Sequence, residues 1–175
     1  SVTKHELVDS PYNKRRQSCE RAAKAIAVNH PEVKLLGDAS LEMLEEVKDS
    51  ISEEDYMRAT YAIQENARLV DTCDALKRGD YETVGKNLYA THHGMSKLYE
   101  VSTEELDFLN EVAKECGVTG SRIMGGGFGG CTLNLVKDAY YDTFIETAIK
   151  RYKAKFGKEP KVYPVTISDG SRRLN

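Results

Sequence analysis

The stretch SRIMGGGFGGCTLNLV, residues 121–136, decides the fold, because it places a glycine-rich loop between two short strand-like segments. Five of the thirteen glycines of the chain lie within residues 125–130. Each glycine inside a folded element costs about 0.5–1 kcal/mol relative to alanine. A fold tolerates five of them where the chain must turn sharply or where another group approaches the backbone, and consecutive amides without side chains can converge on an anion. The loop therefore predicts contact with a phosphorylated ligand or a charged transition state.

The residues next to the loop exclude three common phosphate-binding motifs. Gly125, Gly127 and Gly130 match G-x-G-x-x-G, but the dinucleotide-binding version needs a helix directly after the loop, and a strand-like segment follows here. A Walker loop needs a lysine after its last glycine, where this chain has Cys131. The protein-kinase loop does lie between strands, but the chain has neither V-A-I-K nor H-R-D. An ordinary hairpin turn needs only one or two glycines, so the pattern favours ligand binding over a purely structural turn.

Outside the loop, hydrophobic periodicity and capping residues predict mostly helices. We expect a capping box formed by Ser102 and Glu105 and a long helix that buries one stripe from Tyr56 to Cys73. The two strands beside the short loop should be antiparallel. We therefore predict one α+β domain over residues 1–175, with a small antiparallel sheet covered by helices on one face. Helices are expected over residues 13–28, 40–48, 52–79, 80–98, 102–116 and 138–156, and strands over 2–8, 121–123, 132–136 and 161–167.

Composition narrows the classes of protein further. The net charge of −3 argues against a general nucleic-acid or membrane-binding surface, and the short basic run at residues 14–16 is interpreted as a solvated helix face. The four cysteines form no C-x-x-C pair, so no metal site is predicted, and reduced thiols suit a cytoplasmic protein. No apolar run approaches the roughly 20 residues that a membrane span needs. His92 is interpreted as a packed core histidine rather than a ligand.

Three blocks of the sequence resemble the C-terminal domain of the galactokinases, which are members of the GHMP small-molecule kinase family. The loop with its flanks, RIMGGGFGGCT at residues 122–132, is similar to the third conserved motif of that family. The segments KHEL at 4–7 and SPYNKRRQSCE at 10–20 resemble a block with a tyrosine, a run of arginines and a cysteine seven residues after the tyrosine. The third block comprises RGDY at 78–81, His92, YEVS at 99–102 and ELD at 105–107.

The resemblance implies transfer of the γ-phosphoryl group of ATP to the C1 hydroxyl of galactose, with Mg²⁺, in a cleft of which this domain forms one wall. It implies that Tyr12 contacts the sugar, and it places Lys4 at a basic substrate-binding position of the same block. The phosphate-facing loop would comprise Gly125, Gly126, Gly127, Phe128, Gly129 and Gly130.

The sugar-recognition motif, the serine-rich phosphate loop, the Mg²⁺ ligands and the catalytic Asp and Arg of that family lie in its N-terminal half, and their motifs do not occur in this sequence. We therefore expect no catalytic residue in this chain, no binding of ATP or Mg²⁺ by this part alone, and an N-terminal domain of the same protein as its partner. Two other functions stay open: a kinase of a related sugar, such as N-acetylgalactosamine or arabinose, and a non-catalytic sensor of sugar that regulates a partner protein.

Overall fold

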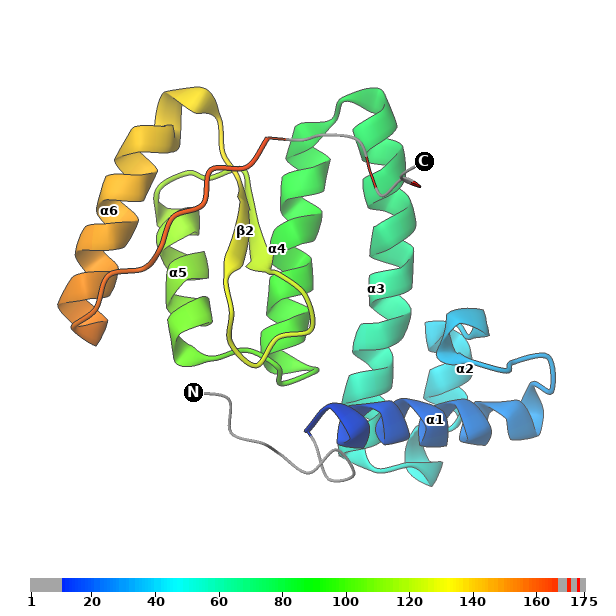
Figure 1. Ribbon diagram of the computed structural model, residues 1–175. Coiled ribbons are helices and arrows are strands. Elements are labelled where there is room, and N and C mark those ends of the chain that lie inside the picture. The colour runs from blue at the N-terminus through cyan, green and yellow to red at the C-terminus, as the bar shows by residue number, and fades with distance from the viewer. Residues whose placement is uncertain (1–10, 167–169, 171–172, 174–175) are drawn as a thin grey trace.

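The structure is a computed structural model that describes residues 11–166, 170 and 173. Its helices and strands follow one another as a row of layers (Figure 1), in which α6, α5, the two strands, α4 and α3 lie side by side and α1 crosses one end of α3. Short 3-10 turns at Leu36–Asp38 and Lys48–Ser50 flank α2. The elements are α1 Pro11–Asn29, α2 Leu41–Glu46, α3 Glu53–Arg78, α4 Tyr81–Lys97, α5 Glu104–Glu115, β1 Gly120–Ile123, β2 Thr132–Leu135 and α6 Asp138–Phe156.

The two strands form an antiparallel pair with Gly120 opposite Leu135 and Ile123 opposite Thr132. Both α4 and α5 contact β1, and α5 also contacts β2. The predicted α+β class, a mostly helical fold with a small antiparallel sheet, is therefore confirmed. The glycine-rich segment is the connection between the strands, so the sequence signal from which the prediction began lies where the chain reverses direction.

Local capping signals set most helix starts as predicted. Ser52 and Asp80 accept hydrogen bonds from the amides of Asp55 and Thr83 at the starts of α3 and α4. The predicted capping box of Ser102 and Glu105 is wrong. Thr103 caps α5 instead, by accepting from the Leu106 amide at 3.4 Å.

The long helix α3 buries two different stripes along its length, which corrects the single stripe predicted to reach Cys73. Ala59 and Ile63 pack into a cluster with α1 and α2. Further along, α3 meets α4 through polar side chains as well: Thr91 donates to the Glu65 carboxylate at 2.9 Å. The end of the predicted stripe, including Cys73, is therefore exposed, because α4 packs on a neighbouring face.

Two glycines let α4 and β1 approach with their backbones almost in contact. A Cβ on Gly85 of α4 would lie 2.6 Å from the carbonyl carbon of Thr119, and one on Gly120 of β1 would lie 2.5 Å from the Cα of Gly85. Real Cβ atoms essentially never lie so close to backbone atoms. The helix is thus fixed against the strand that leads into the glycine-rich loop.

The predicted strand over residues 161–167 does not form within the described residues, which reach 166 in this region. Pro164 has no amide hydrogen for a ladder, and Tyr163 and Val165 are exposed rather than paired. The strand predicted over residues 2–8 lies outside the described residues.

Candidate functional site: a glycine-rich loop

The backbone of the loop adopts conformations that only glycine accepts readily. Gly125, Gly127, Gly129 and Gly130 have φ values of +73°, +87°, +115° and +93°. Phe128 is also left-handed, at φ +61°, which is uncommon for a residue with a side chain. Four of the five glycines therefore follow from the path of the backbone between β1 and β2.

One side of the loop faces open space. Cβ atoms added at Gly125, Gly126, Gly129 or Gly130 would meet nothing within 4 Å. Within residues 11–166, the amides of these four glycines donate no hydrogen bond. Four unpaired amides on an exposed loop without Cβ atoms can donate to a negatively charged group such as a phosphate.

The other side of the loop is attached to the turn between α4 and α5. The amide of Phe128 donates to the carbonyl of Val101 at 2.7 Å. A Cβ at Gly127 would lie 2.6 Å from the Cβ of Val101, so this glycine is required both by its φ and by its neighbour. Val101 is 1% exposed and packs with Ile123, the last residue of β1. The middle of the loop is therefore held in place while its outer glycines stay accessible.

A half-buried carboxylate organises the end of that same turn. Asp107 accepts hydrogen bonds from the Ser96 hydroxyl at 2.8 Å, from the Ser102 hydroxyl, and from His92 Nε2, which lies 3.1 Å away. Burial raises the pKa of Asp107, but the hydrogen bonds from the two hydroxyls and the positive charge of nearby groups, including Lys97, together hold it below its usual value. Burial lowers the pKa of His92, so the neutral ring is favoured. His92 is thus a packed histidine, as predicted, and supports the turn on which the loop rests.

Arg15 is the residue at this site that the sequence analysis missed. The basic run 14–16 was interpreted as a solvated face, but Arg15 is only 9% exposed. Its guanidinium donates to the carbonyls of Tyr99 and Glu100 and to that of Pro11 at 3.0 Å. One signal was available: Arg15 continues the apolar stripe of Cys19, Ala22 and Ile26 at steps of four, three and four.

Of the two predicted sugar-binding residues, only Tyr12 lies within the described residues. Tyr12 lies in the first turn of α1, one turn before Arg15, and its side chain is 66% exposed. Because Arg15 Cζ lies 5.0 Å from the centroid of the Phe128 ring, this end of α1 adjoins the glycine-rich loop. Lys4 lies outside the described residues.

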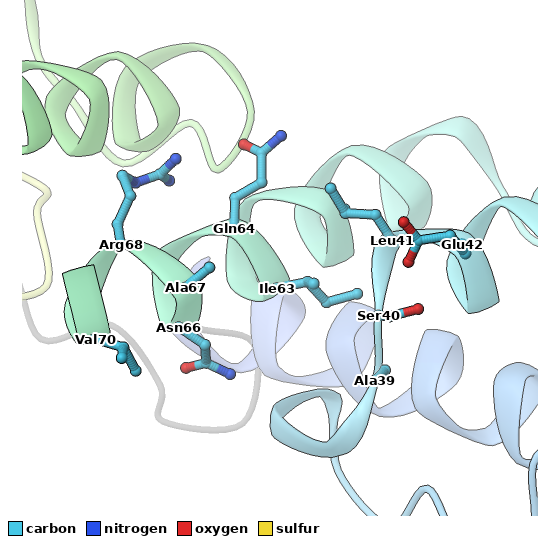
Figure 2. A pocket seen from close by; sticks show the side chains of 10 residues that line it. All are labelled: Ala39, Ser40, Leu41, Glu42, Ile63, Gln64, Asn66, Ala67, Arg68 and Val70. Carbon is cyan, nitrogen blue, oxygen red and sulfur yellow. The ribbon is translucent and has the colours of Figure 1, made fainter.

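Two of the hollows on the surface of the described residues bear on the site. One of about 260 Å³ adjoins the loop and is lined by Gly129, Gly130, the start of α5, and the side chains of Tyr152 and Lys158. The larger one, of about 530 Å³, is mostly apolar and lies between α3 and residues 39–42 (Figure 2). No residue of the glycine-rich loop lines this larger hollow, so we do not assign it to phosphate binding.

Comparison with known proteins identifies the domain. Residues 73–155, which include β1, the loop and β2, match the family model described as "GHMP kinases C terminal". These residues form a GHMP kinase C-terminal domain. The resemblance on which the sequence analysis relied is therefore confirmed, and the loop is a part of this GHMP domain.

Several relatives of this chain are galactokinases. The chain is 41% identical to galactokinases of Fusobacterium nucleatum and Clostridium acetobutylicum, and each alignment covers 98% of this chain and 44% of the relative. A crystal structure of Lactococcus lactis galactokinase complexed with galactose superposes with a TM-score of 0.78 at 31% identity, and covers 90% of this chain and 41% of that one. The chain thus spans less than half the length of the relatives it matches.

The described residues lack the features of a membrane span and of a metal-binding cluster. No helix among them is long and apolar enough to cross a membrane. They also contain no group of three or more His, Cys, Asp or Glu side chains placed to hold a metal ion.

Proposed function

We propose that this chain is the C-terminal domain of a galactokinase, and that it forms one wall of the cleft in which ATP phosphorylates the C1 hydroxyl of galactose. The observation that carries the proposal is the glycine-rich loop, whose outer glycines adjoin open space and donate no amide hydrogen bond within the described residues, beside the end of α1 that bears Tyr12. The likeness to galactokinases over 98% of the chain supports the same activity.

The loop and Tyr12 have different roles in this proposal. Phosphoryl transfer is catalysed mainly by positioning the groups and by stabilising negative charge. The amides of the outer glycines would donate to phosphate oxygens at the moment of transfer, and the anchored Gly127 and Phe128 would keep them from moving away. The exposed phenol of Tyr12 combines an apolar ring with one hydroxyl, which suits contact with a sugar.

Mg²⁺ and the catalytic base are assigned to the remainder of the enzyme. The described residues hold no group of three or more His, Cys, Asp or Glu side chains placed around a metal ion, which is compatible with a Mg²⁺ site formed by the rest of the enzyme and the ATP phosphates. ATP and galactose would then be bound jointly with an N-terminal domain of the same protein, because ligand clefts commonly lie between domains. A cytoplasmic location would suit such an enzyme, and the free cysteines are compatible with it.

A coupled assay of ADP release tests the proposal. The longer protein that contains this chain should turn over ATP with galactose, whereas the 175-residue chain alone should not. Parallel assays with N-acetylgalactosamine and arabinose separate galactokinase from a kinase of a related sugar. Absence of turnover with galactose in the longer protein would contradict the proposed activity, and turnover by the isolated chain would contradict the assignment of the catalytic residues to another domain.

A further inference from the structure

Arg15 connects three segments that are far apart in the sequence. It belongs to α1, its guanidinium hydrogen-bonds the carbonyls of Tyr99 and Glu100 in the turn after α4, and Arg15 Cζ lies 5.0 Å from the ring centroid of Phe128 in the glycine-rich loop. The guanidinium carbon also lies 6.0 Å from the centroid of the Tyr99 ring. One buried cation therefore contacts both the loop and the turn that supports it.

The turn that Arg15 holds is the same turn that positions the loop. Glu100 is left-handed, at φ +52°, so the carbonyls on either side of it point in directions that an extended or helical turn would not give. The next residue, Val101, accepts the hydrogen bond from the Phe128 amide and sets the closest approach to Gly127. A shift in the backbone of the turn would therefore move Val101 and, with it, Gly127 and Phe128 in the middle of the loop.

The fork of donors on arginine is what this arrangement requires. Arg15 uses Nε for one carbonyl, Nη2 for the second and Nη1 for the carbonyl of Pro11, while its flat face meets the aromatic rings. Lysine has a single ammonium group and cannot donate along three fixed directions while stacking on a ring. A general basic residue on a solvated face would need neither property.

We propose that Arg15 is a positioning residue, which fixes the turn at 99–101 and the ring of Phe128 and thereby sets where the outer amides of the glycine-rich loop point. Its effect on loop geometry is a property of this chain alone, whereas its importance for phosphoryl transfer rests on the proposed function. The nearby Arg58 also reaches this turn, since its Nη2 lies 3.4 Å from the Glu100 carboxylate, but that is a contact with a side chain of the turn, and its other partners are Ser18 and Glu54. It therefore does not duplicate the hydrogen bonds of Arg15 to the Tyr99 and Glu100 carbonyls or its contact with Phe128.

Amide hydrogen exchange of the 175-residue chain, followed by NMR, tests the proposal without any assay of activity. In Arg15→Lys the Phe128 amide should exchange about tenfold faster or more, because one or more charge-assisted hydrogen bonds to the supporting turn are lost. The amides of Ile26 and Ala59, in the distant cluster between α1 and α3, serve as the reference for global opening.

Two control variants separate positioning from general stability. Arg16→Lys makes the same chemical change at a side chain that is 69% exposed, and should leave loop exchange as in the wild type. Phe144→Leu weakens the cluster between α5 and α6, and should lower the thermal midpoint without a selective change at Phe128. Unchanged exchange of Phe128 in Arg15→Lys, or an equal selective increase in Phe144→Leu, would overturn the proposal. Because catalysis is not measured, this outcome is independent of whether the protein is a galactokinase.

Discussion

Alanine substitutions at three neighbouring glycines should have sharply different costs, although the chemical change is the same at each. Gly126 is outside the left-handed region and its Cβ would meet nothing, so Gly126→Ala should leave the free energy of unfolding unchanged or raise it by up to about 1 kcal/mol, through the lower entropy of the unfolded chain. Gly125 has φ +73° but open space around it. Gly127 has φ +87° and a Cβ position 2.6 Å from Val101 Cβ.

The two sources of cost can be added for each position. A left-handed residue with a side chain costs about 1–2 kcal/mol, and forcing extra atoms into a packed contact costs about 1–3 kcal/mol. Replacing glycine with alanine also lowers the conformational entropy of the unfolded chain, which stabilises the folded state by about 0.4–1 kcal/mol. Gly125→Ala should thus lose roughly 0.5–1.5 kcal/mol, and Gly127→Ala roughly 2–4 kcal/mol.

Thermal unfolding of the isolated chain, followed by circular dichroism, measures the series. For a domain of this size each kcal/mol lowers the midpoint by about 2–4 °C, so Gly127→Ala should lower it by roughly 5–15 °C. Urea titration of the same variants gives the free energies directly. If Gly127→Ala were no less stable than Gly125→Ala, the close approach of the loop to Val101 would be refuted, and with it the anchoring that we assign to the middle of the loop.

Two further substitutions test the sugar contact and the electrostatics. In the longer protein, Tyr12→Phe should raise the KM for galactose by about tenfold while the KM for ATP and the thermal midpoint stay unchanged, since it removes one hydroxyl from an exposed side chain; an unchanged galactose KM would show that Tyr12 does not contact the sugar. Hydrogen bonds from Arg21 at 2.7 and 2.8 Å lower the pKa of Asp55 below its value of about 4 in the unfolded chain. The ionised carboxylate therefore stabilises the fold above about pH 4, and this stabilisation is lost as the pH falls through the lowered pKa. Asp55→Asn should therefore be less stable at pH 7 and show a flatter loss of stability from pH 4 downwards in urea titrations, and an acid dependence equal to wild type would contradict the assignment.

The parts of the fold that the sequence predicted are those governed by local chemistry. Ser52 and Asp80 cap helices because a short polar side chain reaches its own helix amides, and that interaction depends on residues three positions apart. The glycine-rich loop was recognisable for the same reason, because the need for left-handed backbone is recorded in consecutive residues.

The parts that sequence analysis missed depend on contacts between distant segments. The Tyr99 and Glu100 carbonyls that Arg15 binds lie 84 and 85 residues further along the chain. Helical spacing could place Arg15 on the same face as Ala22 and Ile26, unlike its exposed neighbour Arg16, but it could not show what Arg15 binds. The stripe on α3 was extended too far because the helix changes partners along its length, from α1 and α2 to α4. The cap at Thr103 was missed because Ser102, an equally good capping residue, donates to Asp107 instead.

The contact of Gly85 with Gly120 bears on how this sequence can change over evolutionary time. A methyl group on Gly85 would overlap the backbone of Thr119, and one on Gly120 would overlap the Cα of Gly85, so neither position can accept alanine while the other elements stay where they are. A replacement at either site would have to coincide with a shift of α4 away from β1, and β1 leads directly into the glycine-rich loop. Drift at these two sites is therefore blocked by backbone sterics, even though both lie outside the loop and neither offers a functional group.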